Sequence, residues 1–313
     1  MARKSSKNAS KSTTADWYDR VAATLRTSTE TLSFVTMCLC ILGSVAVLYV
    51  MIPKLRGYLE ARSFVDDTQI RVSFTSSPAW FDQTCVRELT SLVANAVGDG
   101  SALDKTRLTT ARQALAESGW FRSVDQVRLD SKGGFIVDAT FRTPYAVVRQ
   151  NGREYLVDDE GCVLPREWTQ GQRPGNVHWT AIINVAAEVP GPRGKAWEGT
   201  DIAAGLALLR AIREHVPVGT AWEVLVDAID VSRVDAAKEL RIITARGGTV
   251  IWGRTPGDNS PAEIPTARKL AMLDTMYARS QAIDLGGNQV IDVRGDVVTL
   301  APDPAAAKTE QLH

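Results

Sequence analysis

The sequence has few of the residues that most often bind metals or carry redox chemistry, with four cysteines and three histidines among 313 residues. Cys38 and Cys40 lie in an apolar run, where cysteine behaves as a small hydrophobe. Cys85 and Cys162 fall in what we expect to be separate domains, so a disulfide between them, which would need an oxidising compartment, is the minor alternative. Structural zinc sites need closely spaced Cys and His ligands, which this sequence does not have.

The sequence also lacks the common motifs of enzyme active sites. No Gly-x-Ser-x-Gly, paired Cys/His or phosphate-binding loop accompanies His178, His215 or His313. The acidic run of residues 158–160 (Asp-Asp-Glu) favours a solvated hairpin turn over a metal site. We therefore expect a protein that is not an enzyme and that holds no cofactor.

No charge of either sign dominates the chain, because 36 Lys and Arg balance 36 Asp and Glu. Nucleic-acid binding depends mainly on a basic surface that neutralises phosphates. We therefore expect no nucleic-acid partner.

Charge is missing altogether from Leu32 to Ile52. As a helix this stretch would be about 31 Å long, enough to cross a bilayer core of ~30 Å. Six Lys/Arg precede it and three follow it before residue 67, which favours a cytoplasmic N-terminus and an exoplasmic or periplasmic bulk. A cleaved signal peptide is the alternative, but the run starts late, is long and lacks a clear cleavage site. We expect one permanent anchor in the cytoplasmic membrane.

Composition and periodicity divide the chain into six segments. Residues 1–16 are rich in Lys, Ser, Thr and Asn, a composition typical of disorder. We expect a largely disordered cytoplasmic tail (1–31, with a short lead-in helix over 17–31), a membrane helix (32–52), a juxtamembrane spacer (53–67), two exterior domains (68–143 and 144–302) and a disordered tail (303–313).

The first exterior domain has the element order β-α-α-β-β. Polar and apolar residues alternate over 69–74, which predicts a strand. Ser77 and Pro78 predict the start of a helix, and its apolar residues recur every four positions: Phe81, Cys85, Leu89, Val93 and Val97. A second helix over 104–118 and two strands over 124–129 and 135–141, joined by a turn at 132–134, complete the domain.

The second exterior domain begins and ends as a sheet. Asn151-Gly152 is a strong hairpin signal, and Thr200 or Asp201 is a candidate helix cap. We expect strands at 145–149, 154–157, 162–164, 181–185, 222–228, 240–245, 249–252, 290–294 and 297–300, helices at 200–215 and 265–279, and loops at 166–177 and 232–238. The fold class is α+β: a single N-terminal transmembrane helix, a small β-α-α-β-β domain, and a mixed or antiparallel sheet with two or more flanking helices.

The last expected strand is a candidate binding edge. Val297–Leu300 is apolar, lacks proline and closes the folded part of the chain. Edge strands leave backbone groups unpaired, and proteins either block them or use them to add a partner's strand. The alternative is an ordinary strand covered by the C-terminal tail.

Five sets of short motifs occur in a fixed order: Gly119-Trp120-Phe121 with Val127-Arg128-Leu129, Arg142-Thr143-Pro144-Tyr145-Ala146, Tyr155-Leu156-Val157-Asp158 with Gly161, Pro190 to Gly194, and Ile291-Asp292-Val293-Arg294. In turn they resemble the tryptophan and V-x-R pattern, the R-x-P-x-A junction, the Y-L-V-D-x-x-G hairpin, the P-x-x-x-G loop and the V-D-L-R signature of the bacterial cell-division proteins FtsQ/DivIB. The resemblance covers nearly the whole exterior part.

The resemblance implies a POTRA domain over 68–143 and a β domain over 144–302, in a non-enzymatic scaffold at the division septum. In that family the last strand pairs with a strand of FtsB, a small bitopic protein in complex with FtsL, and the POTRA domain docks other division proteins. It implies six partner-binding residues here: Asp292, Arg294, Val297, Val298, Thr299 and Leu300. Two positions that contact the partner in the family depart from its pattern, with Gly295 in place of an aromatic and Leu300 in place of a tryptophan.

Two other classes remain open. A POTRA-containing envelope transport or assembly component normally carries a membrane barrel after its POTRA domains, and we expect no such series of amphipathic strands here. An exoplasmic cell-wall enzyme would show activity in the fragment from residue 66 onward.

The expected topology can be tested with intact spheroplasts. Protease added from outside should digest the C-terminal part, because we expect it to lie beyond the membrane. Lysed cells serve as the control for complete digestion. Protection of the C-terminal part, or recovery of the full-length chain in the soluble lysate, would contradict the topology.

Overall fold

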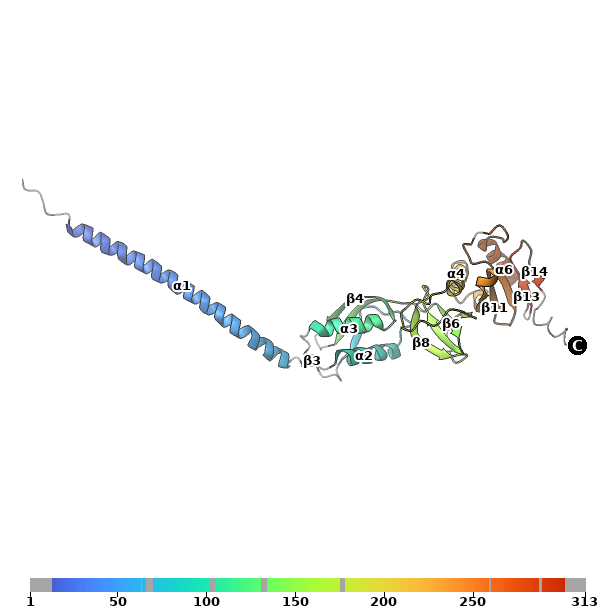
Figure 1. Ribbon diagram of the computed structural model, residues 1–313, viewed down its shortest axis with the longest axis horizontal. Helices are drawn as coiled ribbons and strands as arrows, with labels where there is room; N and C mark the ends of the chain where they lie inside the picture. The colour runs from blue at the N-terminus through green and yellow to red at the C-terminus, as the bar shows by residue number, and fades with distance from the viewer. Residues whose placement is uncertain are drawn as a thin grey trace, which may run out of the picture. The chain divides into compact units, whose positions relative to one another are not determined.

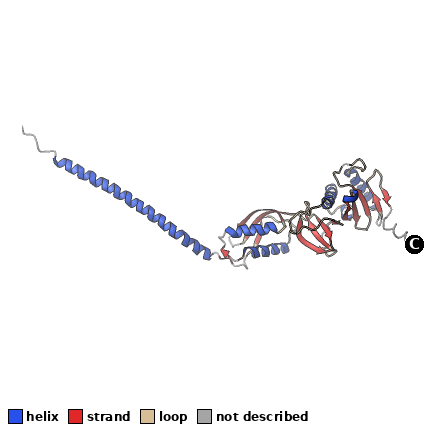
Figure 2. Ribbon diagram, in the orientation of Figure 1, coloured by secondary structure: helices blue, strands red, loops and turns tan. Residues whose placement is uncertain are grey.

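The structure is a computed structural model that describes residues 13–62, 64–65, 70–98, 100–101, 105–130, 134–174, 178–258, 260–286 and 289–301. It is a mixed α+β protein with a long N-terminal helix and a large mixed sheet (Figure 1; Figure 2). The chain divides into two compact units, one made of residues 1–64 with 101–103 and the other of residues 65–100 with 104–313.

The first unit is dominated by α1 (Thr13–Arg62), a continuous helix that contains Pro53. Its segment Ser33–Leu55 has a mean hydropathy of 2.5 and is the one helix of the described residues that is long and apolar enough to cross a membrane. Proline is tolerated in membrane helices, where neighbouring groups and small adjustments satisfy the freed carbonyl. The candidate membrane helix predicted from the uncharged run is therefore present.

The helix differs from our expectation at both ends. We expect a largely disordered tail over 1–31 and a spacer over 53–67, but α1 begins at Thr13 and continues to Arg62, while residues 1–12, 63 and 66–67 lie outside the described part. No glycine or proline lies between Thr13 and Gly43. Extending an existing helix costs far less than nucleating one, so the apolar span carries its flanks into the same helix.

In the second unit, a three-stranded sheet packs with two helices. The sheet has the order β2-β5-β4, with β2 parallel to β5 and β4 antiparallel to it. The elements are β2 (Val72–Phe74), α2 (Gln83–Val97), α3 (Lys105–Glu117), β4 (Phe121–Leu129) and β5 (Phe135–Phe141), which differs from the predicted order β-α-α-β-β by one short strand between the two helices. Two strands of two residues, β1 (Phe64–Val65) and β3 (Gly100–Ser101), lie outside this sheet.

Helix α2 starts later than the prediction from Ser77 and Pro78. Asp82 is its N-cap, since its carboxylate accepts a hydrogen bond from the backbone N–H of Cys85 at 2.9 Å. Pro78 instead begins a turn, closed by the N–H of Phe81 donating to its carbonyl at 3.0 Å. The sequence offers two capping side chains, and the Asp82 carboxylate satisfies one of the unpaired N–H groups in the first turn of the helix. The predicted core residues Cys85, Leu89 and Val93 are buried.

The same unit contains a nine-stranded mixed sheet with the order β14-β13-β12-β11-β10-β9-β6-β7-β8. Three neighbouring pairs are parallel (β6 with β9, β9 with β10, and β12 with β13) and the others are antiparallel. The strands are β6 (Ala146–Gln150), β7 (Arg153–Val157), β8 (Val163–Thr169), β9 (Ala181–Ile183), β10 (Val226–Arg233), β11 (Glu239–Thr244), β12 (Thr249–Gly253), β13 (Val290–Asp292) and β14 (Thr299–Ala301).

The sheet packs against α4 (Thr200–His215) and α6 (Thr266–Ser280) in one hydrophobic core. The core face of α4 carries Ile202, Leu206, Leu209 and Ile212, spaced at three and four residues, and all four are buried. Gly205 allows α4 to approach the sheet closely, since a Cβ there would lie 3.0 Å from Cγ2 of Ile182.

Neither of the two residues predicted to cap α4 is its N-cap. Gly199 is the N-cap, while Asp201 accepts from the N–H groups of Ala186 at 2.7 Å and Ile202 at 2.8 Å.

Two stretches expected to be loops are ordered elements. β8 extends to Thr169 because residues 167 and 168 pair with β7, and its proline is tolerated at the sheet edge. β10 is shifted four residues beyond the predicted start, since a 3-10 turn, η2 (Glu223–Leu225), comes before it, and the short helix α5 (Val234–Ala237) follows it.

The predicted Asn151-Gly152 hairpin is confirmed, with φ of 51° and 73° at the two residues.

Truncation of the α4 core face tests this packing. Leu209→Ala should lower the free energy of unfolding by about 2–5 kcal/mol, because a fully buried leucine leaves a cavity. Urea unfolding followed by tryptophan fluorescence measures the change. Val218→Ala is the control, since Val218 is 60% exposed. Equal effects of the two substitutions would contradict the packing described here.

Candidate partner-binding site

β14 lies at one edge of the nine-stranded sheet. Within the described residues its one neighbouring strand is β13, against which it runs antiparallel with Val290 opposite Ala301, Ile291 opposite Leu300 and Asp292 opposite Thr299. In the part of the chain that the structure describes, one side of its backbone therefore has no strand to pair with. Such a row of N–H and C=O groups is a template for a further strand.

The opposite edge of the sheet, β8, is blocked at its start. Its first residue, Val163, donates to the carbonyl of Lys195 at 3.0 Å and accepts from the N–H of Gly194 at 2.7 Å. Cys162 forms an isolated bridge with Ala196. Pro165 lies within β8 and offers no backbone donor. The start of β8 is thus paired, whereas β14 has no further strand beside it among the described residues.

The side chains near β14 leave apolar surface exposed. Ile291 is fully buried, and Leu300 opposite it lies on the same face of the sheet, because directly paired residues do. Leu300 is nevertheless 64% exposed, and Val297 is 72% exposed. Exposed apolar side chains along an unpaired edge indicate a binding surface more than an isolated exposed leucine would.

The predicted last strand, Val297–Leu300, is displaced in the structure. β14 begins at Thr299, so Val297 and Val298 lie in the preceding loop, where Val298 packs against the large core. The cause is an Asx turn at the end of β13, in which the Asp292 carboxylate accepts from the backbone N–H of Arg294 at 2.9 Å. This turn ends the strand at Asp292 instead of Arg294 and moves the next strand along the chain.

Asp292 and Arg294, two predicted partner-binding residues, are paired with each other. The guanidinium of Arg294 lies 2.6 Å from Oδ2 of Asp292 and 3.2 Å from a carboxylate oxygen of Glu239 on β11. Burial raises the pKa of Asp292, but the hydrogen bonds from Arg294 lower it. The net pKa of Asp292 lies below its usual value. The arginine holds the turn before β14 and, being 39% exposed, keeps part of its charge accessible.

A groove of about 600 Å³ lies beside this edge, between α6 and the loop before β14. An ion pair of 2.9 Å joins Arg268 of α6 to Asp296 of the loop. The groove is lined by apolar side chains and by a basic side chain from each of the first and last turns of α6; its residues are Arg268, Ala271, Met272, Thr275, Met276, Arg279, Ser280, Leu285, Asp296, Val297 and Val298. Sequence periodicity could not show the groove, because its two walls come from elements about 20 residues apart.

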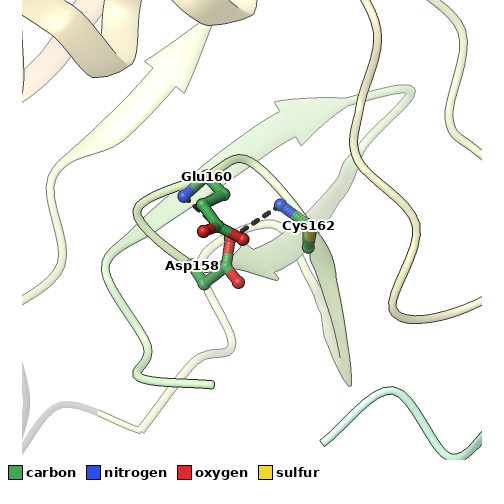
Figure 3. A group of neighbouring side chains, drawn as sticks. All are labelled: Asp158, Glu160 and Cys162. Atoms are coloured by element: carbon green, nitrogen blue, oxygen red, sulfur yellow. Dashed lines mark hydrogen bonds between the residues drawn. The ribbon is translucent and has the colours of Figure 1, made fainter. Parts of the chain in front are cut away.

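The acidic hairpin turn brings Asp158, Glu160 and Cys162 within 4.8 Å of one another (Figure 3). One carboxylate oxygen of Asp158 accepts from the N–H groups of Glu160 at 3.0 Å and Cys162 at 2.8 Å, and the other accepts from Arg142 at 2.7 Å. Burial and the nearby Asp158 raise the pKa of the Cys162 thiol. A metal would need thiolate and free carboxylate ligands, and it would compete with an arginine already in place. The geometry therefore fits a turn, but the prediction that the acidic run is solvated is wrong for Asp158, whose side chain is fully buried; Asp159 and Glu160 are exposed.

The histidines contact structural partners. Nε2 of His178 lies 3.1 Å from the carbonyl oxygen of Val226. His215, the last residue of α4, lies 2.7 Å from Asp274 of α6, whose other oxygen accepts from the indole N–H of Trp222 at 2.8 Å. His313 is outside the described residues. The two described histidines thus help to join elements of the fold.

Comparison of the chain with models of known protein families and with curated proteins gave no match. A proposal for the function therefore depends on the sequence motifs and on the geometry of the sheet edge at β14.

The Asp292–Arg294 pair should contribute to stability in a pH-dependent way. Because the pKa of Asp292 is lowered from 3.8 in the folded state, the carboxylate stabilises the fold at neutral pH, and this stabilisation is lost as the pH falls through the folded-state pKa. Asp292→Asn should lower the urea midpoint at about pH 7, and the deficit should shrink below about pH 4.

Asp296→Asn is the matched control, because Asp296 is 68% exposed in its ion pair with Arg268 and exposed pairs contribute little. It should change the midpoint less at every pH. A deficit for Asp292→Asn that is constant with pH would contradict the role of its charge.

Proposed function

We propose that the protein is a non-enzymatic, membrane-anchored scaffold of the bacterial cell-division machinery, similar to FtsQ/DivIB, that binds FtsB/FtsL-type partners at the septum. The observation that carries the proposal is the edge strand β14, which follows the motif Ile291-Asp292-Val293-Arg294 and carries the exposed Leu300, with the exposed Val297 in the loop before it. The series of short motifs along the exterior part supports the same family.

Strand addition explains how such an edge binds a partner. Main-chain hydrogen bonds supply direction and affinity, and alternate side chains of the added strand enter pockets that supply specificity. A strand beside β14 would continue the sheet and place every second side chain on the face of Leu300 and Ile291. The apolar groove beside α6 lies next to this edge and would accept further apolar side chains.

The anchor and the first module complete the proposal. The apolar helix Ser33–Leu55 would hold the chain in the cytoplasmic membrane with its N-terminus in the cytoplasm. Confinement to the membrane raises the effective concentration of a partner that is also anchored there. The module β2-α2-α3-β4-β5 has the element order of a POTRA domain and would dock other division proteins.

Localisation tests the proposal as a whole. A fluorescent fusion of the full chain should be enriched at midcell, which separates a division scaffold from an envelope transport component and from a cell-wall enzyme. An even distribution around the cell envelope would contradict the proposal.

A charge at the open edge tests the binding mode. Leu300→Asp should weaken pull-down of the FtsB-type partner from the same cells by about tenfold or more, because an added strand would remove the new carboxylate from water. Stability should change little, since Leu300 is 64% exposed.

Val218→Asp is the matched control, because it places the same charge at a valine that is 60% exposed and outside β14 and its groove. Wild-type binding by Leu300→Asp would rule out strand addition at β14.

A further inference from the structure

Motifs that are far apart in the sequence meet at one junction of the second unit. We name its two parts the first module (residues 70–141) and the second module (residues 146–301). Gly119, which precedes β4 in the first module, lies against Gly194 of the second. A Cβ at Gly119 would be 2.8 Å from the backbone nitrogen of Gly194, and a Cβ at Gly194 would be 2.9 Å from Cα of Gly119. Both residues have positive φ, 84° and 79°. Each glycine therefore meets two requirements, backbone conformation and close approach.

A buried ion pair crosses the same junction. Arg142 follows β5, the last strand of the first module, and its guanidinium lies 2.7 Å from the carboxylate of Asp158, whose side chain is fully buried. Arg122 of β4 forms a further ion pair with Asp159. Removal of one partner of a buried pair leaves an uncompensated charge and is strongly destabilising. The pair therefore opposes separation of the two modules.

The hydrophobic core is continuous across the junction. Val147, Leu156 and Leu164, from β6, β7 and β8, belong to the same buried cluster as the core residues of α2 and β5. Arg166 of β8 lies 3.1 Å from Glu88 and donates to Sγ of Cys85 at 3.4 Å, both on α2. Its guanidinium also lies 5.8 Å from the ring centre of Trp120. A hinge motion would expose this cluster to water.

We propose that these contacts form an intramolecular clamp that makes the first and second modules one rigid block. The clamp is the glycine contact, the Arg142–Asp158 pair and the shared core. The connection between β5 and β6 is only residues 142–145 and contains Pro144, so it offers little freedom of its own. A partner that binds at β14 would then be held at a set position relative to the first module. This inference goes beyond the proposed function and does not depend on the identity of the partner.

Distance measurements on the full chain in lipid nanodiscs test the clamp. Nitroxide labels are placed at Ser91→Cys on α2 and Ala278→Cys on α6, both exposed positions. Cys38 and Cys40 are replaced by alanine, and Cys85 and Cys162 are buried. A rigid block gives one narrow distance distribution by pulsed electron spin resonance. A broad distribution in the protein with an intact junction would overturn the proposal.

Substitutions at the junction identify the clamp residues. Gly119→Ala should broaden or shift the distribution, because its Cβ would overlap the backbone of Gly194. Gly171→Ala is the matched control, with a φ of 80° but no atom within 4 Å of the added Cβ, so it carries the backbone strain without the overlap. Identical distributions for the two variants would overturn the role of the glycine contact.

Arg142→Ala gives a second and independent measurement if Gly119→Ala does not fold, as judged by circular dichroism. It should also broaden the distribution, whereas the control Arg153→Ala, at an arginine that is 58% exposed, should not. Equal distributions for these two variants would overturn the role of the ion pair.

Discussion

The requirement that backbone N–H and C=O groups find partners governs every part of this protein. In a bilayer the chain can meet the requirement within itself only as a helix, which is what the uncharged run forms in α1. In the large sheet each strand meets it through its neighbours until the edges are reached. At the start of β8 a crossing segment pairs with the outer backbone groups and a proline removes a donor, whereas β14 has no outer strand among the described residues. The edge that is left open is where we place the partner.

Charged groups support the same edge from inside the fold. Asp292 ends β13 by accepting from the backbone of Arg294, and the arginine side chain returns to Asp292 and reaches Glu239 on β11. Glu239 in turn pairs with Arg241 at 2.8 Å. The turn before β14 is therefore held by several charges instead of one exposed pair, and such networks resist distortion better than single surface pairs. A preorganised edge loses less conformational entropy when a partner binds.

Much of the fold could be predicted because it depends on local pattern. Alternation places β5 at 135–141, the Asn151-Gly152 turn joins β6 to β7, and apolar spacing gives the buried face of α4. The errors arise where two local signals compete. Ser77 and Asp82 both offer helix caps, and Asp292 can either continue a strand or turn the chain. Periodicity does not decide such cases, because tertiary packing determines which of the two hydrogen bonds forms.

The candidate site was predictable in part for the same reason. An apolar last strand without proline is visible in the sequence, but whether it lies at an edge depends on a sheet order in which β14 is separated from β8 by seven other strands. The glycine contact is harder still, since Gly119 and Gly194 are 75 residues apart and each looks like ordinary turn chemistry alone. Their positive φ shows why glycine is favoured at each position, and their contact adds a reason that spacing cannot supply. A short motif can therefore depend on a long-range contact, and four residues of the family-like motifs, Gly119, Arg142, Asp158 and Gly194, help to join the two modules.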